Sequence, residues 1–97
     1  MLAVDTNLVV RLLTNDDRGQ ARRAAAIFAA NEVFVPKTVL LETEWVLRHA
    51  YSLERAAVVR GLLGVLGLRS VIAEDALDVA AALGWYQRGI DFADAMH

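Results

Sequence analysis

The hydrophobic positions of this chain fall into three short continuous runs, separated by longer stretches with helical spacing. The continuous runs predict buried strands, at residues 2–4, 33–35 and 71–73. The stretches between and after them predict helices over residues 8–13, 21–30, 38–51, 53–66 and 74–88. Residues 90–97 have the pattern of one more helix start. The predicted order is therefore β-α-α-β-α-α-β-α, followed by the start of a helix.

Polar residues indicate where several of these helices begin. Asn7 precedes the first helix, Thr38 opens the third, and Ser52 precedes the fourth. Each has a short side chain that can accept a hydrogen bond from the first turn of a helix. Glu74 and Asp75 follow the third strand, and we expect the fifth helix to start there.

The large side chains of the predicted helices are expected to contribute to the core. Trp45 and Trp85 lie at spacings that suit core packing, so we expect neither to be a stacking platform. Leu77, Val79 and Tyr86 are among the residues that the fifth helix should bury.

Strands separated by helices indicate a parallel sheet, and we expect a three-layer α/β/α arrangement around it. A parallel sheet is covered on both faces, which explains strands that are apolar runs without alternation. The length of 97 residues allows one domain, expected to span residues 1–97.

The composition narrows the possible environments and partners. The chain has no cysteine, which indicates a reducing compartment, and we expect it to be cytoplasmic. It has neither the pattern of a secretory signal nor an uncharged apolar stretch of about 18 residues, so no membrane association is expected. The net charge of −2 provides no bulk attraction to nucleic acid.

Asp5 directly follows the first predicted strand. In open parallel sheets, ligands bind at the carboxyl ends of the strands. A carboxylate there is costly to bury unless it is paired or binds a metal. The alternative is that Asp5 caps the following helix.

The third predicted helix carries two acids in different surroundings. Glu44 has Arg48 four residues later, the favourable order for an ion pair at the surface. Glu42 has no base at helical spacing and lies among apolar neighbours, so it needs a distant partner such as a metal or another acid at a strand end. A partly exposed glutamate is the alternative.

Asp91 and Asp94 lie three residues apart at the start of the last predicted helix. They could serve as its N-cap and its third residue, both favourable positions for acids. Alternatively they could project beside Asp5 and Glu42, where the like charges would require a cation. Three or four oxygen donors suit Mg²⁺ or Mn²⁺.

Other catalytic sets have less support. His49 is a lone helical histidine and His97 is the last residue, so neither is a strong candidate. A phosphotransfer receiver needs a lysine late in the fold, whereas the only lysine is Lys37. An aspartate-nucleophile phosphatase usually has an aspartate where this chain has Asn7.

Three motifs in order resemble the PIN domain of VapC-type toxins: AVDTN, VPKTVLLETEWVLR and GIDFADAMH. The resemblance extends over residues 1–97. It implies a metal-dependent endoribonuclease that acts on RNA, the toxin component of a type II toxin–antitoxin pair. It also implies two protein partners, a cognate antitoxin and a second copy of the chain in a homodimer.

The resemblance also implies which residues form the site. The catalytic and metal-binding acids would be Asp5, Glu42 and Asp94, with Asp91 as an accessory metal ligand, and the supporting polar residues would be Asn7 and Thr6. The cofactor would be Mg²⁺, with Mn²⁺ as a substitute. Without the four acids, eight acidic residues remain against ten basic ones, so the charge is compatible with RNA binding.

The resemblance also implies a longer domain, since members of that family usually continue beyond this last helix start. We therefore expect this single domain to lack the C-terminal strand and helix of the family. The alternative function is a catalytically incomplete fragment that acts as an antitoxin-binding or dimerisation module.

Overall fold

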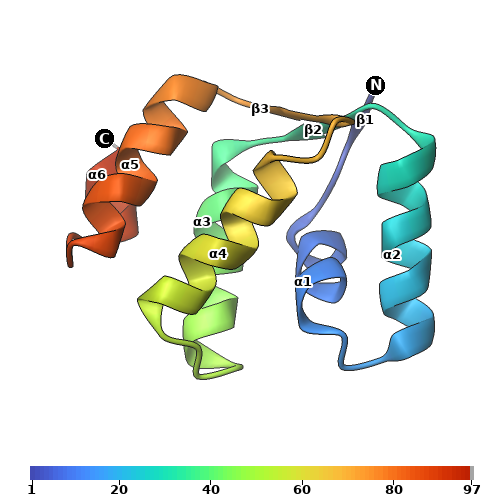
Figure 1. Cartoon of the computed structure of the whole chain (residues 1–97), viewed down its shortest axis with the longest axis horizontal. Coiled ribbons are helices and arrows are strands. Elements are labelled where there is room, and N and C mark those ends of the chain that lie inside the picture. The colour runs from blue at the N-terminus through green and yellow to red at the C-terminus, as the bar shows by residue number, and fades with distance from the viewer. Residues whose placement is uncertain (97) are drawn as a thin grey trace.

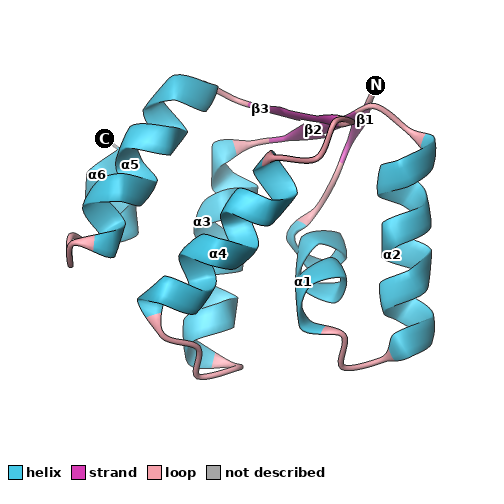
Figure 2. Cartoon of the chain, in the orientation of Figure 1, coloured by secondary structure: helices cyan, strands magenta, loops and turns pink. Residues whose placement is uncertain are grey.

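A computed structural model of the chain describes residues 1–96. Figures 1 and 2 show a mixed α/β structure with the following elements: β1 (Leu2–Ala3), α1 (Thr6–Thr14), α2 (Arg18–Ala30), β2 (Val33–Val35), α3 (Lys37–His49), α4 (Arg55–Leu66), β3 (Val71–Ala73), α5 (Ala76–Gln87) and α6 (Phe92–Met96). The predicted order of elements is confirmed. Within this described part, no helix is long and apolar enough to cross a membrane.

The strands form one parallel sheet in the order β1-β2-β3, as expected. Leu2 lies opposite Val33, and Phe34 lies opposite Ile72. The pairs of helices that connect successive strands carry the chain back, so each new strand begins at the same end of the sheet. In Figure 1, α1 and α2 lie at one end of the molecule, α5 and α6 at the other, and α3 and α4 between them.

The two faces of the sheet differ in burial. Val33 and Val35 of β2 are completely buried under the flanking helices. The row on the opposite face consists of Ala3, Phe34 and Ile72, and none of these three is buried. The fold class is confirmed, but the expectation that both faces are covered holds for only one face in residues 1–96.

The core lies between the covered face of the sheet and the helices. The central helices α3 and α4 supply five apolar side chains that are at most 1% exposed: Leu40, Leu47, Val58, Leu62 and Val65. Complete burial of such a side chain stabilises the fold by about 1.5–3 kcal/mol. Thus α3, which carries Glu42, is anchored along its length by the core.

The first helix begins earlier than the sequence pattern predicts. Asp5 is its N-cap, and the Oδ1 atom of Asp5 accepts a hydrogen bond of 2.9 Å from the backbone N–H of Leu8. The helix therefore starts at Thr6, and the predicted cap, Asn7, lies within its first turn. The capping alternative for Asp5 is confirmed.

The other two predicted caps, Thr38 and Ser52, are also wrong. The third helix starts at Lys37 rather than at Thr38, because the carbonyl oxygen of Pro36 already accepts hydrogen bonds from the first turn. Ser52 does not cap the fourth helix, since its φ of 54° places it in the left-handed region within the preceding turn. The N-cap of the fourth helix is Glu54.

Glu74 and Asp75 lie between β3 and α5, and their side chains contact Lys37, the first residue of α3. The backbone N–H of Lys37 donates a hydrogen bond of 2.9 Å to Glu74 Oε1. The ammonium group of Lys37 lies 2.6 Å from Asp75 Oδ2, and this contact raises the pKa of Lys37. Helix α5 then begins at Ala76, two residues after Glu74, where the predicted helix begins.

Several large side chains expected in the core lie at the surface. Trp45 is 59% exposed, Trp85 is 54% exposed and Leu77 is 89% exposed. Helix α5 is apolar on nearly every side, so its periodicity cannot identify the buried face. Its buried residues include Val79 and Tyr86, as predicted.

Candidate functional site

Asp5 stands at the carboxyl end of β1. The preceding residue, Val4, is buried and donates its backbone N–H to the Phe34 carbonyl of β2, whereas Asp5 itself is exposed. The capping bond to Leu8 involves only Oδ1. Capping is therefore compatible with a second role for the carboxylate at this edge of the sheet.

Thr6 connects this edge to the third helix. Its hydroxyl donates a hydrogen bond of 3.2 Å to Glu42 Oε2, across 36 positions of the chain. The side chain of Glu42 is exposed rather than set on an apolar face, because α3 turns Leu40, Thr43 and Glu44 toward the interior instead. The distant partner that Glu42 has in the structure is thus a hydroxyl group.

Asp91 and Asp94 occupy the capping positions proposed for them. Asp91 Oδ1 accepts a hydrogen bond of 3.2 Å from the backbone N–H of Asp94, at the start of α6. Phe92 and Ala95 form the buried side of this helix. Both aspartates are exposed, so α6 presents them to solvent.

Glu42 and Asp91 line the same hollow of about 320 Å³. We call it the acidic hollow; its other lining residues are Leu41, Glu44, Trp45 and Ala93. Two acids that are 49 positions apart in the sequence therefore line one hollow, where α3 packs against α6.

Glu44 is a buried acid, and the expectation of a surface ion pair was wrong. Glu44 is 9% exposed, and its Oε2 accepts a hydrogen bond of 2.9 Å from the hydroxyl of Tyr86. The same oxygen lies 3.4 Å from Nη1 of Arg48, so the predicted pairing exists in a different environment. Burial, and then the Glu44 carboxylate, raises the pKa of Tyr86 to about 12.

Arg55 holds the turn that leads into α6, a role that was absent from the sequence prediction. Its Nη1 donates hydrogen bonds to the carbonyl oxygens of Tyr86 and Ile90, at 2.9 and 2.8 Å. Its guanidinium also lies over the Tyr86 ring, 4.6 Å from the centroid. Because the last carbonyls of a helix lack partners within it, Arg55 satisfies the end of α5 and fixes the residue before Asp91.

The acids do not form one compact cluster. Among residues 1–96, no group of three or more His, Cys, Asp and Glu side chains lies close enough together to hold a metal ion. The chemistry of the donors nevertheless suits a hard divalent cation, because all are carboxylate oxygens. The ion pairs found in residues 1–96 are Lys37–Asp75 and Arg48–Glu44. They include none of the four predicted ligands, which are Asp5, Glu42, Asp91 and Asp94.

Of the two histidines, His49 lies within the described residues. The ring of His49 lies beside the indole of Trp45, with centroids 4.7 Å apart and planes at 36°. It is not among the residues that line the acidic hollow. His97 lies outside the described residues.

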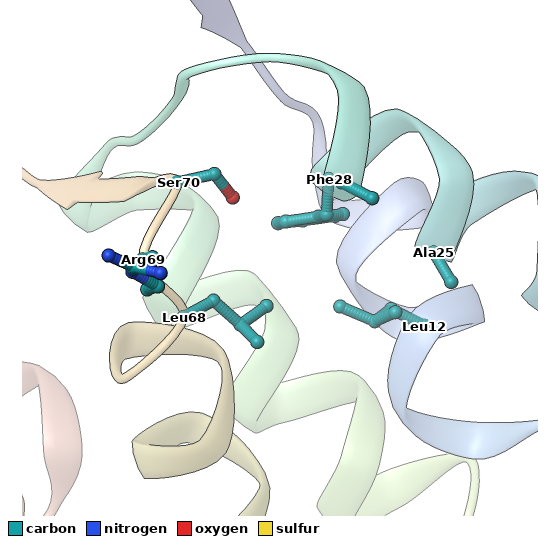
Figure 3. A pocket seen from close by; sticks show the side chains of 7 residues that line it. Leu12, Ala25, Phe28, Leu68, Arg69 and Ser70 are labelled. Carbon is teal, nitrogen blue, oxygen red and sulfur yellow. The ribbon is translucent and has the colours of Figure 1, made fainter.

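A second hollow, which we call the apolar hollow, has a volume of about 380 Å³ (Figure 3). It lies between α1, α2 and the segment that joins α4 to β3, and its lining residues include Leu12, Ala25, Phe28, Leu68, Arg69 and Ser70. None of the predicted site residues contributes to it.

Comparison with family models identifies the fold. The PIN domain model matches residues 2–97, and the chain belongs to the PIN domain family. PIN domains are generally nucleases that use divalent metal ions. Comparisons with curated proteins and with solved structures gave no match.

Proposed function

We propose that this chain is a metal-dependent endoribonuclease that cleaves RNA phosphodiester bonds in the cytoplasm, as the toxin component of a type II toxin–antitoxin system. The observation that carries the proposal is that Glu42 and Asp91 line the same hollow, while the Thr6 hydroxyl connects Glu42 to the carboxyl end of β1. Family membership supports the nuclease chemistry. The antitoxin and the homodimer belong to the same proposal.

In this proposal, Asp5, Glu42 and Asp94 hold Mg²⁺, with Asp91 as an accessory ligand, and Mn²⁺ can substitute. A bound cation supplies positive charge against the phosphodiester and lowers the pKa of the attacking water. The donor chemistry suits Mg²⁺, because Mg²⁺ takes oxygen ligands.

The surrounding residues position these acids. The hydroxyl of Thr6 orients Glu42 through Oε2. The cap from Asp91 to the backbone of Asp94 holds both acids on the exposed side of α6. Asn7 is exposed in the first turn of α1, where its amide could orient a carboxylate or a water molecule.

The test is cleavage of a single-stranded RNA in Mg²⁺, with EDTA as the first control. Asp5→Asn and Asp94→Asn should abolish cleavage while the variants stay folded, because asparagine is also a good N-cap at position 5. Asp78→Asn is a matched control, since Asp78 is an exposed acid on α5 outside the acidic hollow. Unchanged cleavage in Asp5→Asn, or cleavage that survives EDTA, would contradict the proposal.

A second candidate function is an antitoxin-binding or dimerisation module without catalysis. The observation that favours it is apolar surface away from the acids. This surface lies in the apolar hollow (Figure 3) and on α5, where Leu77 and Trp85 are exposed. Large exposed apolar patches mark interaction sites. Stable association with a co-expressed antitoxin, together with no Mg²⁺ affinity in calorimetry and no cleavage, would favour this candidate over the nuclease.

A further inference from the structure

The side chain of Trp45 lies in an unexpected place for so large an apolar group. It is 59% exposed on α3, a helix that is otherwise well anchored in the core. It lines the acidic hollow together with Glu42 and Asp91. Trp45 follows Glu42 by three positions, so the two side chains lie on the same side of the helix.

The neighbours of Trp45 extend this aromatic surface. His49 lies one turn further along α3, is also exposed, and keeps its ring 4.7 Å from the indole. Arg48 lies three positions after Trp45, and 35% of its side chain is exposed. Arg48 pairs with Glu44, so the stacking surface consists of the two exposed rings. Exposed aromatic rings are the surfaces on which proteins stack the bases of single-stranded nucleic acids.

We propose that Trp45, supported by His49, is a stacking platform for one base of a single-stranded RNA at the acidic hollow. The identity of the ligand as RNA rests on the proposed function. The base contributes a flat apolar face to the indole, and its sugar contributes a 2′-hydroxyl that can donate to a carboxylate of the hollow.

The proposed metal ligands favour a nucleotide over an apolar protein surface as the occupant, because a cation held by Glu42 and Asp91 would attract the RNA phosphates that the carboxylates alone would repel. A protein face packed on Trp45 would also cover Glu42 and Asp91. Neither acid belongs to an ion pair of residues 1–96, and the burial of charged carboxylates without a cation is costly. A nucleotide leaves room for water, and it pairs polar groups with the acids while its base covers the ring. The alternative occupant is a second copy of the chain, and the test must distinguish it from RNA.

The chain provides its own control, because its only other tryptophan is Trp85. Trp85 is 54% exposed on α5 and does not line the acidic hollow. The Trp85→Phe variant therefore reports the fluorescence of Trp45 alone, and Trp45→Phe reports Trp85 alone. The probe is an oligoadenylate of about six nucleotides, within the usual range of single-strand binding sites.

We expect the oligoadenylate to quench the emission of Trp45 in a saturable manner and to leave that of Trp85 unchanged. Trp45→Ala should weaken binding by about 5- to 150-fold, the range for loss of one stacked base, whereas Trp45→Phe should retain most of the affinity. Trp85→Ala should bind like the wild type. Circular dichroism checks that each variant is folded. We expect folded variants, because both tryptophan side chains are exposed.

Equal quenching of both tryptophans, or unchanged affinity in Trp45→Ala, would overturn the platform. So would a dimer that dissociates in Trp45→Ala by light scattering, since Trp45 would then lie between two copies. The test is separate from that of the nuclease, because Asp94→Asn should lose cleavage and keep the quenching. Quenching of Trp45 without any cleavage would support the stacking platform and contradict the proposed nuclease. Cleavage without quenching would support the nuclease and contradict the platform.

Discussion

The hydroxyl group of Tyr86 donates a 2.9 Å hydrogen bond to Glu44 Oε2 and joins α5 to α3 in the interior. Tyr86 is completely buried, and Glu44 lies two positions after the proposed metal ligand Glu42. The ring of Tyr86 also packs against Phe92, with centroids 5.2 Å apart. This one side chain therefore connects the helices that carry Glu42, Asp91 and Asp94.

Tyr86→Phe should lower the free energy of unfolding by about 1–3 kcal/mol, because it removes the hydroxyl donor to a buried carboxylate and keeps the ring. Urea denaturation followed by circular dichroism measures the change. Trp85→Phe, a substitution at an exposed aromatic residue of the same helix, should change stability by less than about 0.5 kcal/mol. Equal stability of the two variants would show that the bond to Glu44 contributes nothing.

The pKa of Tyr86 predicts a loss of stability in alkaline solution. Burial and the Glu44 carboxylate raise this pKa to about 12, whereas the phenol of an unfolded chain has a pKa of about 10. The folded chain therefore binds the phenolic proton more tightly, and this contribution is complete below about pH 10 and disappears as the pH rises toward about 12. Urea unfolding across this window should show a steeper loss for the wild type than for Tyr86→Phe. Parallel pH profiles would be inconsistent with the raised pKa.

Arg55→Met should both destabilise the chain and reduce RNA cleavage. It removes two charge-assisted hydrogen bonds to the carbonyls of Tyr86 and Ile90, a loss of about 1.5–3 kcal/mol for each. Cleavage should fall further than the folded fraction accounts for, since the turn before Asp91 loses its support. Arg60→Met, at an exposed position on α4, is the matched control. If Arg55→Met lowered cleavage only in proportion to unfolding, Arg55 would be structural alone.

Thr6→Val should reduce cleavage several-fold with little effect on stability. The substitution keeps the shape of the side chain and removes the hydroxyl that orients Glu42. The bond is long and exposed, so its loss should change the free energy of unfolding by less than about 0.5 kcal/mol. Thr6→Ser should restore cleavage, because serine keeps the donor. A fully active Thr6→Val enzyme would show that Glu42 needs no support from this residue.

The sequence by itself determined the order of the elements, the parallel sheet and the family. These properties depend on local patterns: Val33–Val35 is a continuous apolar run, and Asp91 with Asp94 has the spacing of a helix cap. The structure confirmed the capping bonds of Asp5 and Asp91, because a cap joins residues only three positions apart. The motifs around Asp5, Glu42 and Asp94 are continuous in the chain, so they indicate the PIN domain without reference to tertiary contacts.

Only the tertiary structure decided which acid of α3 is buried and which aromatic side chains are exposed. The i, i+4 spacing correctly paired Glu44 with Arg48, but the buried partner of Glu44 is Tyr86, 42 positions away. Likewise, the exposure of Trp45 depends on how α3 is rotated against α6, which its own periodicity leaves open. Burial and distant hydrogen bonds depend on which elements pack against a helix. The spacing of residues within that helix does not specify those elements.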